Sequence, residues 1–293
     1  MLHTIKNDFL TVTAQEAGAQ LLSVLGADGT EYLWQGDSKY WSDRSPNLFP
    51  YVGRLKEGHY YMDGTTYQMR IHGIAPYRDF RLVSNNGNEM VLELTDDAET
   101  LAQYPRRFAF RVIYRLDGST LEVCYEVENR DEKGMYFGLG GHPGFHVPLA
   151  EGKAFEDYRL RFGEVTDCRE VILTPDCFIT DATRPFPLEE GCILPLRHSL
   201  FDNDAIVLTG MARSITLETE GGGHSVTVSY PQMPYLGLWH RPHTDAPYVC
   251  IEPWCSLPSG ADGVTVLEEK KDLLFLEAGD TYQNRWSIQV GSR

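Results

Sequence analysis

Three parts of the chain place ionisable side chains among glycine, proline and aromatic residues, which an ordinary run of alternating strand residues does not require. They are NLFPYVGRLKEG at 47–58 with RIHGIAPYRDF at 70–80, YFGLGGHPGFHVP at 136–148, and YVCIEPWCSLPSG at 248–260. Glycine lets the backbone approach a ligand closely, and proline holds the backbone in one conformation. These parts are therefore the first candidates for a functional site.

Two histidines in these parts are candidates for proton transfer or ligand binding. His142 stands between Gly141 and Pro143, so its side chain has little freedom and a defined direction. His72 precedes Gly73 at a predicted strand end. Because a single histidine is usually structural, His72 needs support from its surroundings, whereas the residues on either side of His142 already provide it.

The strongest candidate for a general base is Glu252. It follows the apolar run Tyr-Val-Cys-Ile at the end of a predicted strand and precedes Pro253 and Trp254. A carboxylate buried in such surroundings is costly without a partner, and apolar surroundings raise its pKa toward the range of a useful base. Arg54, which follows Gly53, could pair with an acid or hold a ligand hydroxyl, and a surface arginine is the competing interpretation.

Two histidines, one carboxylate, an arginine and several tryptophans together predict a pocket for a neutral ligand with many hydroxyl groups. Aromatic faces stack on the apolar faces of sugar rings, while carboxylate, imidazole and guanidinium groups hydrogen-bond the hydroxyls. An acid and a base also suit one reaction of such ligands. Opening a cyclic hemiacetal removes a proton from the anomeric hydroxyl and gives another to the ring oxygen.

Other chemistries lack their signatures. The chain has no G-x-S-x-G, no Walker A pattern, no helix-opening G-x-G-x-x-G and no H-E-x-x-H. The spacing of His142 and His146 falls on a strand-like segment with an intervening proline, so a metal site has weak support. Cys250 and Cys255 are expected to pack in the core. Four other histidines are interpreted as structural or peripheral: His146, His224, His240 and His243.

The composition limits the partners and the compartment. Lys and Arg number 26 against 42 Asp and Glu, a formal charge of −16, so we expect neither nucleic-acid nor membrane-surface partners. The net charge does not exclude a small anionic ligand, because the charge around one pocket can differ from that of the whole surface. The N-terminal residues show no signal peptide, and no apolar run is long enough to span a membrane. The 6 cysteines form no C-x-x-C pair, which favours a cytoplasmic protein with reduced thiols.

Short alternating runs separated by turn residues predict an all-β chain. Hairpins are expected where pairs of such runs flank a turn: 19–25 with 31–34, 60–62 with 66–69, and 108–116 with 121–127. Further strands are expected at 9–13, 205–208, 215–218, 225–230, 236–239, 248–251 and 286–290. Residues 97–104 could form two helical turns, and 268–276 are ambiguous. We interpret residues 1–293 as a single sandwich or barrel domain.

With these motifs in this order, the chain resembles the aldose 1-epimerase (galactose mutarotase) superfamily, and within it the LacX-like group. The matching stretches are LFPYVGRL, the HG at 72–73, GGHPGFHVPL, LFDNDA at 200–205 and YVCIEPW with the downstream SLPSG. They cover nearly the whole chain. GGHPGF combined with CIEPW is the most specific part of the resemblance.

The resemblance implies a β-supersandwich of large antiparallel sheets that needs no cofactor or metal. It implies that Glu252 takes the proton from the anomeric hydroxyl, that His142 protonates the ring oxygen, and that His72 assists and binds substrate. Arg54 would contact sugar hydroxyls. Trp254, two residues after Glu252, is a further candidate for substrate binding. An acid between His142 and Glu252 binds hydroxyls in the family, and the candidates are Asp204 first and Asp202 second.

One stretch departs from the family pattern. Close relatives tend to read H-G-F-A-R, whereas this chain continues His72-Gly73-Ile74-Ala75-Pro76, with an arginine only at position 78. The pocket wall beside His72 is therefore expected to differ, which affects the choice of substrate more than the fold.

Four functional hypotheses follow. The leading one is an isomerase, a mutarotase acting on a free aldose as monomer or homodimer. A hexose-6-phosphate mutarotase would draw on Arg54, Lys56, Arg70 and Arg78 for its phosphate, against the acidic balance. A non-catalytic carbohydrate-binding protein on the same fold would not need a proton-transfer pair. A structural β-sandwich partner protein leaves the glycine- and proline-framed ionisable residues unexplained.

Overall fold

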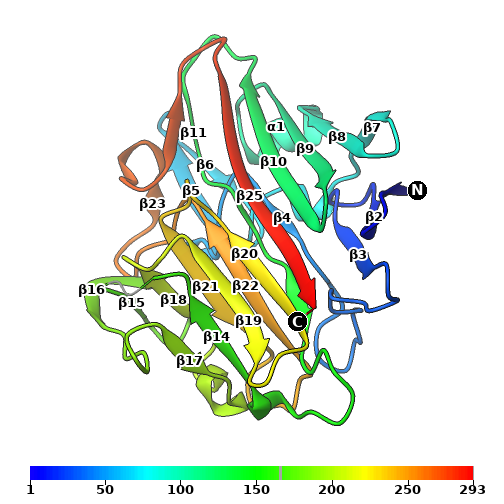
Figure 1. Ribbon diagram of the computed structural model, residues 1–293. Coiled ribbons are helices and arrows are strands. Elements are labelled where there is room, and N and C mark those ends of the chain that lie inside the picture. The colour runs from blue at the N-terminus through cyan, green and yellow to red at the C-terminus, as the bar shows by residue number, and fades with distance from the viewer. Residues whose placement is uncertain (165–166, 293) are drawn as a thin grey trace.

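A computed structural model describes residues 1–164 and 167–292, and strands dominate it (Figure 1). Two large antiparallel sheets form the body of the molecule, as the alternating pattern predicts. Among the described residues, no helix combines the length and the apolar character that crossing a bilayer requires.

The larger sheet has nine strands in the order β17-β14-β19-β20-β25-β10-β9-β8-β7. Its strands are β7 (Arg81–Asn85), β8 (Glu89–Thr95), β9 (Phe108–Asp117), β10 (Thr120–Asn129), β14 (Tyr158–Phe162), β17 (Ile193–Pro195), β19 (Ser214–Thr219), β20 (His224–Ser229) and β25 (Thr281–Ser292). The C-terminal strand β25 lies in its middle, between β20 and β10. The expected hairpin at 108–116 and 121–127 is confirmed as β9 and β10.

The second sheet carries the candidate residues. It runs β16-β15-β18-β21-β22-β12-β4, and β13 pairs with β22 beside β12. Its strands are β4 (Asn47–Leu48), β12 (Gly140–Gly141), β13 (Gly144–His146), β15 (Arg169–Leu173), β16 (Ile179–Pro185), β18 (Ile206–Thr209), β21 (Tyr235–Trp239) and β22 (Tyr248–Trp254). Strand β22 is central and buried along its whole length.

Smaller elements surround the two sheets. They are the sheets β1 (Leu2–Lys6), β2 (Leu10–Gln15), β3 (Leu21–Gly26); β11 (Met135–Phe137), β24 (Leu274–Leu276); and β5 (His59–Met62), β6 (Thr65–Gln68), β23 (Thr265–Val266). The helices are α1 (Ala98–Gln103) and the 3₁₀ turns η1 (Lys56–Gly58), η2 (Ala75–Tyr77), η3 (Phe155–Asp157), η4 (His198–Phe201) and η5 (Leu267–Glu269). The expected helix at 97–104 is thus confirmed, and Asp97 caps it through the backbone N–H of Thr100. The ambiguous stretch 268–276 divides between η5 and β24.

One expected hairpin is only partly correct. The turn after β3 forms, and Leu25 bridges Glu31, but residues 31–34 make no regular strand. Leu33 instead bridges Phe145, and Trp34 N–H donates to Gly144 O at 2.9 Å. This segment crosses from one sheet system to the other, which a local pattern does not reveal.

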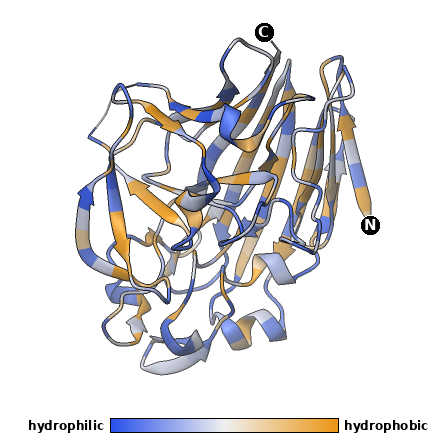
Figure 2. Cartoon of the chain, turned by 90° about the horizontal axis from the view of Figure 1, so that it is seen from below, coloured by the Kyte–Doolittle hydropathy of each residue, from blue (hydrophilic) through white to orange (hydrophobic). Residues whose placement is uncertain are grey.

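The core lies between the inner faces of the large sheets. A Cβ on Gly141 of β12 would lie 2.5 Å from the ring of Trp286 on β25, so the two sheets touch there. Tyr125 of β10 also donates to Gly140 O across the interface at 3.1 Å. Figure 2 shows hydrophobic and hydrophilic residues alternating along the strands, the pattern of a sheet with one buried face. The segment carrying His142 is therefore fixed from behind by the core.

Candidate active site

A cavity of about 650 Å³ opens on the second sheet, and six of the candidate site residues line it. They are Arg54, His72, His142, Asp204, Glu252 and Trp254. The cavity draws residues from position 41 to position 258, so segments far apart in sequence converge on one space. It is of ordinary size for a small-molecule site.

Strand β22 positions Glu252 and Trp254. Alternate residues of a strand share a face, so Cys250, Glu252 and Trp254 point to the same side. The expectation that the strand ends at Glu252 is wrong, because the ladder continues through Pro253 to Trp254. Glu252 is only 1% exposed and lies opposite Gly237 of β21.

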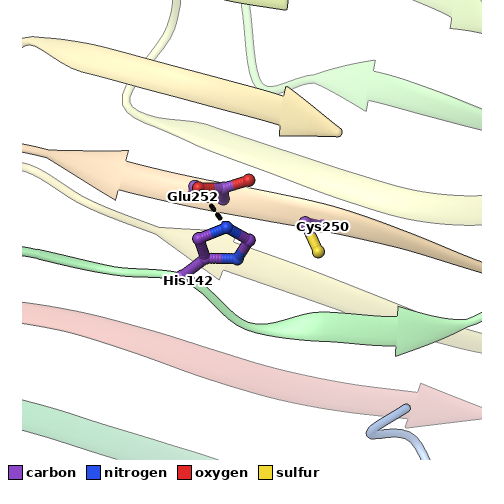
Figure 3. A group of neighbouring side chains, drawn as sticks. All are labelled: His142, Cys250 and Glu252. Atoms are coloured by element: carbon purple, nitrogen blue, oxygen red, sulfur yellow. Dashed lines mark ion pairs between the residues drawn. The ribbon is translucent and has the colours of Figure 1, made fainter. Parts of the chain in front are cut away.

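The segment after β12 positions His142. Its N–H donates to Pro46 O at 3.0 Å, and its Nε2 lies 3.2 Å from Glu252 Oε2 (Figure 3). The ring of Trp41 lies 4.9 Å from the imidazole at 31°, and that of Trp239 lies 5.8 Å away at 81°. These two indoles hold the imidazole in the direction of the carboxyl group.

Burial changes the acid–base properties of this pair. It raises the pKa of Glu252 well above its usual range, and the nearby Asp204 adds to the rise. It lowers the pKa of His142 well below the usual range, with His72 as a further cause. Each group therefore favours its neutral form. Transfer of one proton across the 3.2 Å between Glu252 Oε2 and His142 Nε2 converts this neutral pair into a carboxylate and an imidazolium. The pair can exchange roles without a change in its total charge.

His72 enters the cavity from a turn, so the expected strand end is wrong. Its backbone has a positive φ of 66°, and Gly73 follows at 83° with Phe49 O only 2.4 Å from where a Cβ would stand. Gly53 N–H donates to His72 Nδ1 at 3.2 Å. Burial, and then the charge of Arg54, lower the pKa of His72 to about 4. The neutral ring therefore carries its proton on Nε2 and can donate from there.

The two candidate acids occupy different places. Asp204 lines the cavity, and its Oδ1 accepts from the N–H of Ala205 at 2.9 Å. Asp202 does not line the cavity, and its Oδ1 lies 3.2 Å from His243 Nδ1. Of the two candidate acids, Asp204 is therefore the one at the cavity. Arg54 is exposed at the cavity and forms no ion pair within the described residues.

Sequence reasoning missed several lining residues. Trp41, Trp239 and His243 line the cavity, and for His243 the interpretation as a structural or peripheral residue misses this position. Trp41 lies in an irregular loop without periodicity, so the only signal was its being one of few tryptophans. His240 is fully buried and its Nε2 lies 3.1 Å from His198 Nδ1, in agreement with a structural residue.

One group near the cavity has the composition of a metal site. Donor atoms of His142, Cys250 and Glu252 all lie within 4.8 Å of one another. Cys250 is fully buried, as expected of a core residue. Its sulfur nevertheless lies beside the acid–base pair (Figure 3).

Comparisons with known proteins agree with this arrangement. The family model described as aldose 1-epimerase matches residues 1–289. The plasmid-encoded protein LacX of Lactococcus lactis subsp. lactis is 33% identical over 299 aligned residues, 98% of each chain. A galactose mutarotase related enzyme from Lactobacillus acidophilus is 32% identical with a TM-score of 0.92, covering 100% of this chain and 98% of the other. A galactose mutarotase-like protein from Lactobacillus casei is 32% identical with a TM-score of 0.94, covering 99% of this chain and 100% of the other.

Proposed function

The chain belongs to the aldose 1-epimerase family, and we propose that it interconverts the α and β anomers of a free aldose by opening and closing the sugar ring. The observation that carries this proposal is the contact of 3.2 Å between His142 Nε2 and Glu252 Oε2 at the wall of a cavity. Ring opening needs a base at the anomeric hydroxyl and an acid at the ring oxygen. Glu252 and His142 share one proton, so one of them can act as the base while the other acts as the acid.

In the productive state Glu252 is a carboxylate and His142 an imidazolium. Glu252 removes the proton of the anomeric hydroxyl while His142 protonates the ring oxygen, and the C1–O5 bond breaks to leave the open-chain aldehyde. Both side chains are then neutral, which is the state that their buried surroundings favour. Rotation about C1–C2 and the reverse transfers give the other anomer and restore the starting charges.

The remaining residues orient the sugar in this proposal. His72 donates its Nε2–H toward the ring oxygen, since its Nδ1 already accepts from Gly53. Arg54 and Asp204 bind hydroxyl groups, and Trp254 contacts an apolar face of the ring. Because the cavity combines residues from both halves of the sequence, we propose that the whole chain acts as one domain.

A neutral sugar is favoured over a sugar phosphate because most cationic residues considered for a phosphate site already interact with other groups of the protein. Lys56 Nζ donates to Ala261 O, and Arg70 lies over the ring of Tyr77 at 3.6 Å. Arg78 is paired with Asp97 and Glu99. Of these four cations, Arg54 alone lines the cavity among the described residues, where Arg241 is the other arginine.

The test is polarimetry or NMR of freshly dissolved glucose, galactose and their 6-phosphates, with and without the protein. We expect faster approach to anomeric equilibrium for a free aldose. Binding of sugars without acceleration would instead support a non-catalytic carbohydrate-binding protein. Faster reaction of the phosphates than of the free sugars would contradict the proposed substrate class.

A further inference from the structure

We propose that His142, Cys250 and Glu252 together form an inhibitory site for a zinc-like divalent cation. One nitrogen, one thiol sulfur and one carboxylate oxygen lie within 4.8 Å of one another. Cys250 and Glu252 project from the same face of β22, and His142 approaches them from the segment after β12 (Figure 3). Imidazole, thiolate and carboxylate are the ligand types that zinc takes in proteins.

A buried oxygen without a hydrogen bond is a second sign of a ligand in the same place. Glu252 Oε2 is buried and makes no hydrogen bond within the described structure, although His142 Nε2 lies 3.2 Å from it. Buried polar atoms are nearly always partnered, so such atoms point to a missing ligand. A sugar accounts for the carboxyl group, but ring opening has no use for a sulfur atom beside it.

The geometry suits a small tetrahedral ion. Ideal zinc bonds of about 2.0 to 2.3 Å place neighbouring donors roughly 3.3 to 3.7 Å apart. The nitrogen and oxygen of His142 and Glu252 already meet this at 3.2 Å. The sulfur of Cys250 needs to approach by about 1 Å or less, which a small side-chain rotation supplies. The fourth position faces the cavity, because His142 and Glu252 both line it.

Charge selects the kind of ion. A divalent cation with one thiolate, one carboxylate and a neutral imidazole has no net charge, which suits a buried position. Two protons leave when the metal binds, the thiol proton of Cys250 and the proton shared by Glu252 and His142, and no electrons are transferred. Magnesium and calcium prefer six or more oxygen ligands, so they fit this site poorly.

The inhibitory effect rests on the proposed function, whereas metal binding does not. A bound ion occupies the lone pairs that Glu252 and His142 use for proton transfer. It also stands where the anomeric centre of the sugar must lie. We therefore expect inhibition that competes with the sugar and is reversed by a chelator.

The experiment uses Co²⁺ as a spectroscopic probe of the full-length protein. A thiolate ligand gives Co²⁺ an intense near-ultraviolet charge-transfer band. We expect the band in the wild type and in Cys177→Ser, the control, because Cys177 is another free cysteine that lines the cavity. Cys250→Ser and Cys250→Ala should lack the band while melting cooperatively, and Zn²⁺ but not Mg²⁺ should displace Co²⁺ from the wild type.

Activity supplies the second measurement. Cys250→Ser should retain basal mutarotation and need more than roughly tenfold more Zn²⁺ for inhibition, since losing even a residue that supports a zinc ligand costs about 10- to 100-fold. No band in the wild type, or a band that survives Cys250→Ser and Cys250→Ala, would overturn the site. A band without inhibition would overturn its inhibitory effect. A protein inactive on every sugar refutes the proposed function, and the spectrum still decides the metal site.

Discussion

Replacing Glu252 by glutamine should lower activity and raise stability at the same time. The carboxyl group is buried, and its Oε2 has no hydrogen-bond partner within the described structure although His142 Nε2 lies 3.2 Å away. Glutamine keeps the shape, cannot act as a base, and offers an N–H that His142 can accept. A group kept for catalysis rather than for the fold should respond in this way.

The loss of activity follows from the chemistry of a general base. Such a group contributes about 10² to 10⁴ in rate. At about 1.36 kcal/mol for each factor of ten, this equals roughly 3 to 5 kcal/mol of transition-state stabilisation. We expect the loss in kcat, with KM changed much less, because the amide still hydrogen-bonds hydroxyl groups.

The gain in stability follows from satisfying a buried polar atom. A buried donor or acceptor without a partner costs about 1 to 3 kcal/mol. For a chain of this size that corresponds to a rise of roughly 2 to 6 °C in Tm. The pKa of Glu252 is higher in the folded than in the unfolded chain. The contribution of Glu252 to the free energy of unfolding is therefore complete below the unfolded pKa and is lost as pH rises through the folded pKa. The advantage of glutamine should therefore disappear in acid and grow toward neutral pH.

Thermal unfolding between pH 4 and pH 8, together with polarimetry in EDTA, measures both effects. The matched control is Glu31→Gln, because Glu31 Oε1 accepts from Val24 N–H at 2.9 Å and Leu33 N–H at 3.0 Å, outside the cavity. Glutamine there keeps an oxygen for both N–H groups and relieves no buried unpartnered atom, so that variant should keep activity and gain no stability. Full activity of Glu252→Gln, or a large loss of its stability at neutral pH, would refute the reasoning.

Three other substitutions test the surroundings of the pair. His72→Gln should weaken kcat/KM by roughly tenfold, the value of about one hydrogen bond to the reacting sugar, and unchanged steady-state kinetics would exclude contact with substrate. Gly73→Ala should destabilise the fold by about 2 kcal/mol or more in chemical denaturation, because φ is 83° and the new Cβ would lie 2.4 Å from Phe49 O. Asp204→Asn removes a negative charge that raises the pKa of Glu252, so the acidic limb of the kcat/KM profile should move to lower pH. A shift toward higher pH would contradict that coupling.

The fold could be predicted largely because strand formation is local. Alternation in Phe108–Asp117 and Thr120–Asn129 directly encodes β9 and β10. Residues 31–34 could not be assigned in this way, since Leu33 and Trp34 pair with distant residues around Gly144 and Phe145. Pairing across the chain is set by the packed sheets and not by the segment itself.

Part of the site could also be predicted, because some of its residues carry local signals in the sequence. Glycine and proline around His142 mark a constrained backbone, and an acid within the apolar run of β22 marks a costly burial. Trp41 and Trp239 carry no comparable local signal, although both contact the imidazole. Cys250 looked like a core residue and is one, and only the folded sheet shows which pair its sulfur adjoins.

The most direct test of the central claim is anomeric exchange measured at equilibrium by NMR. Saturation of the α-anomeric signal of a free aldose in EDTA should transfer to the β signal when the wild-type protein is present. The transfer should vanish with Glu252→Gln and with a methyl glycoside, which has no anomeric hydroxyl proton to remove. Absence of transfer with every free aldose, or transfer that survives Glu252→Gln, would contradict proton transfer between Glu252, His142 and the sugar.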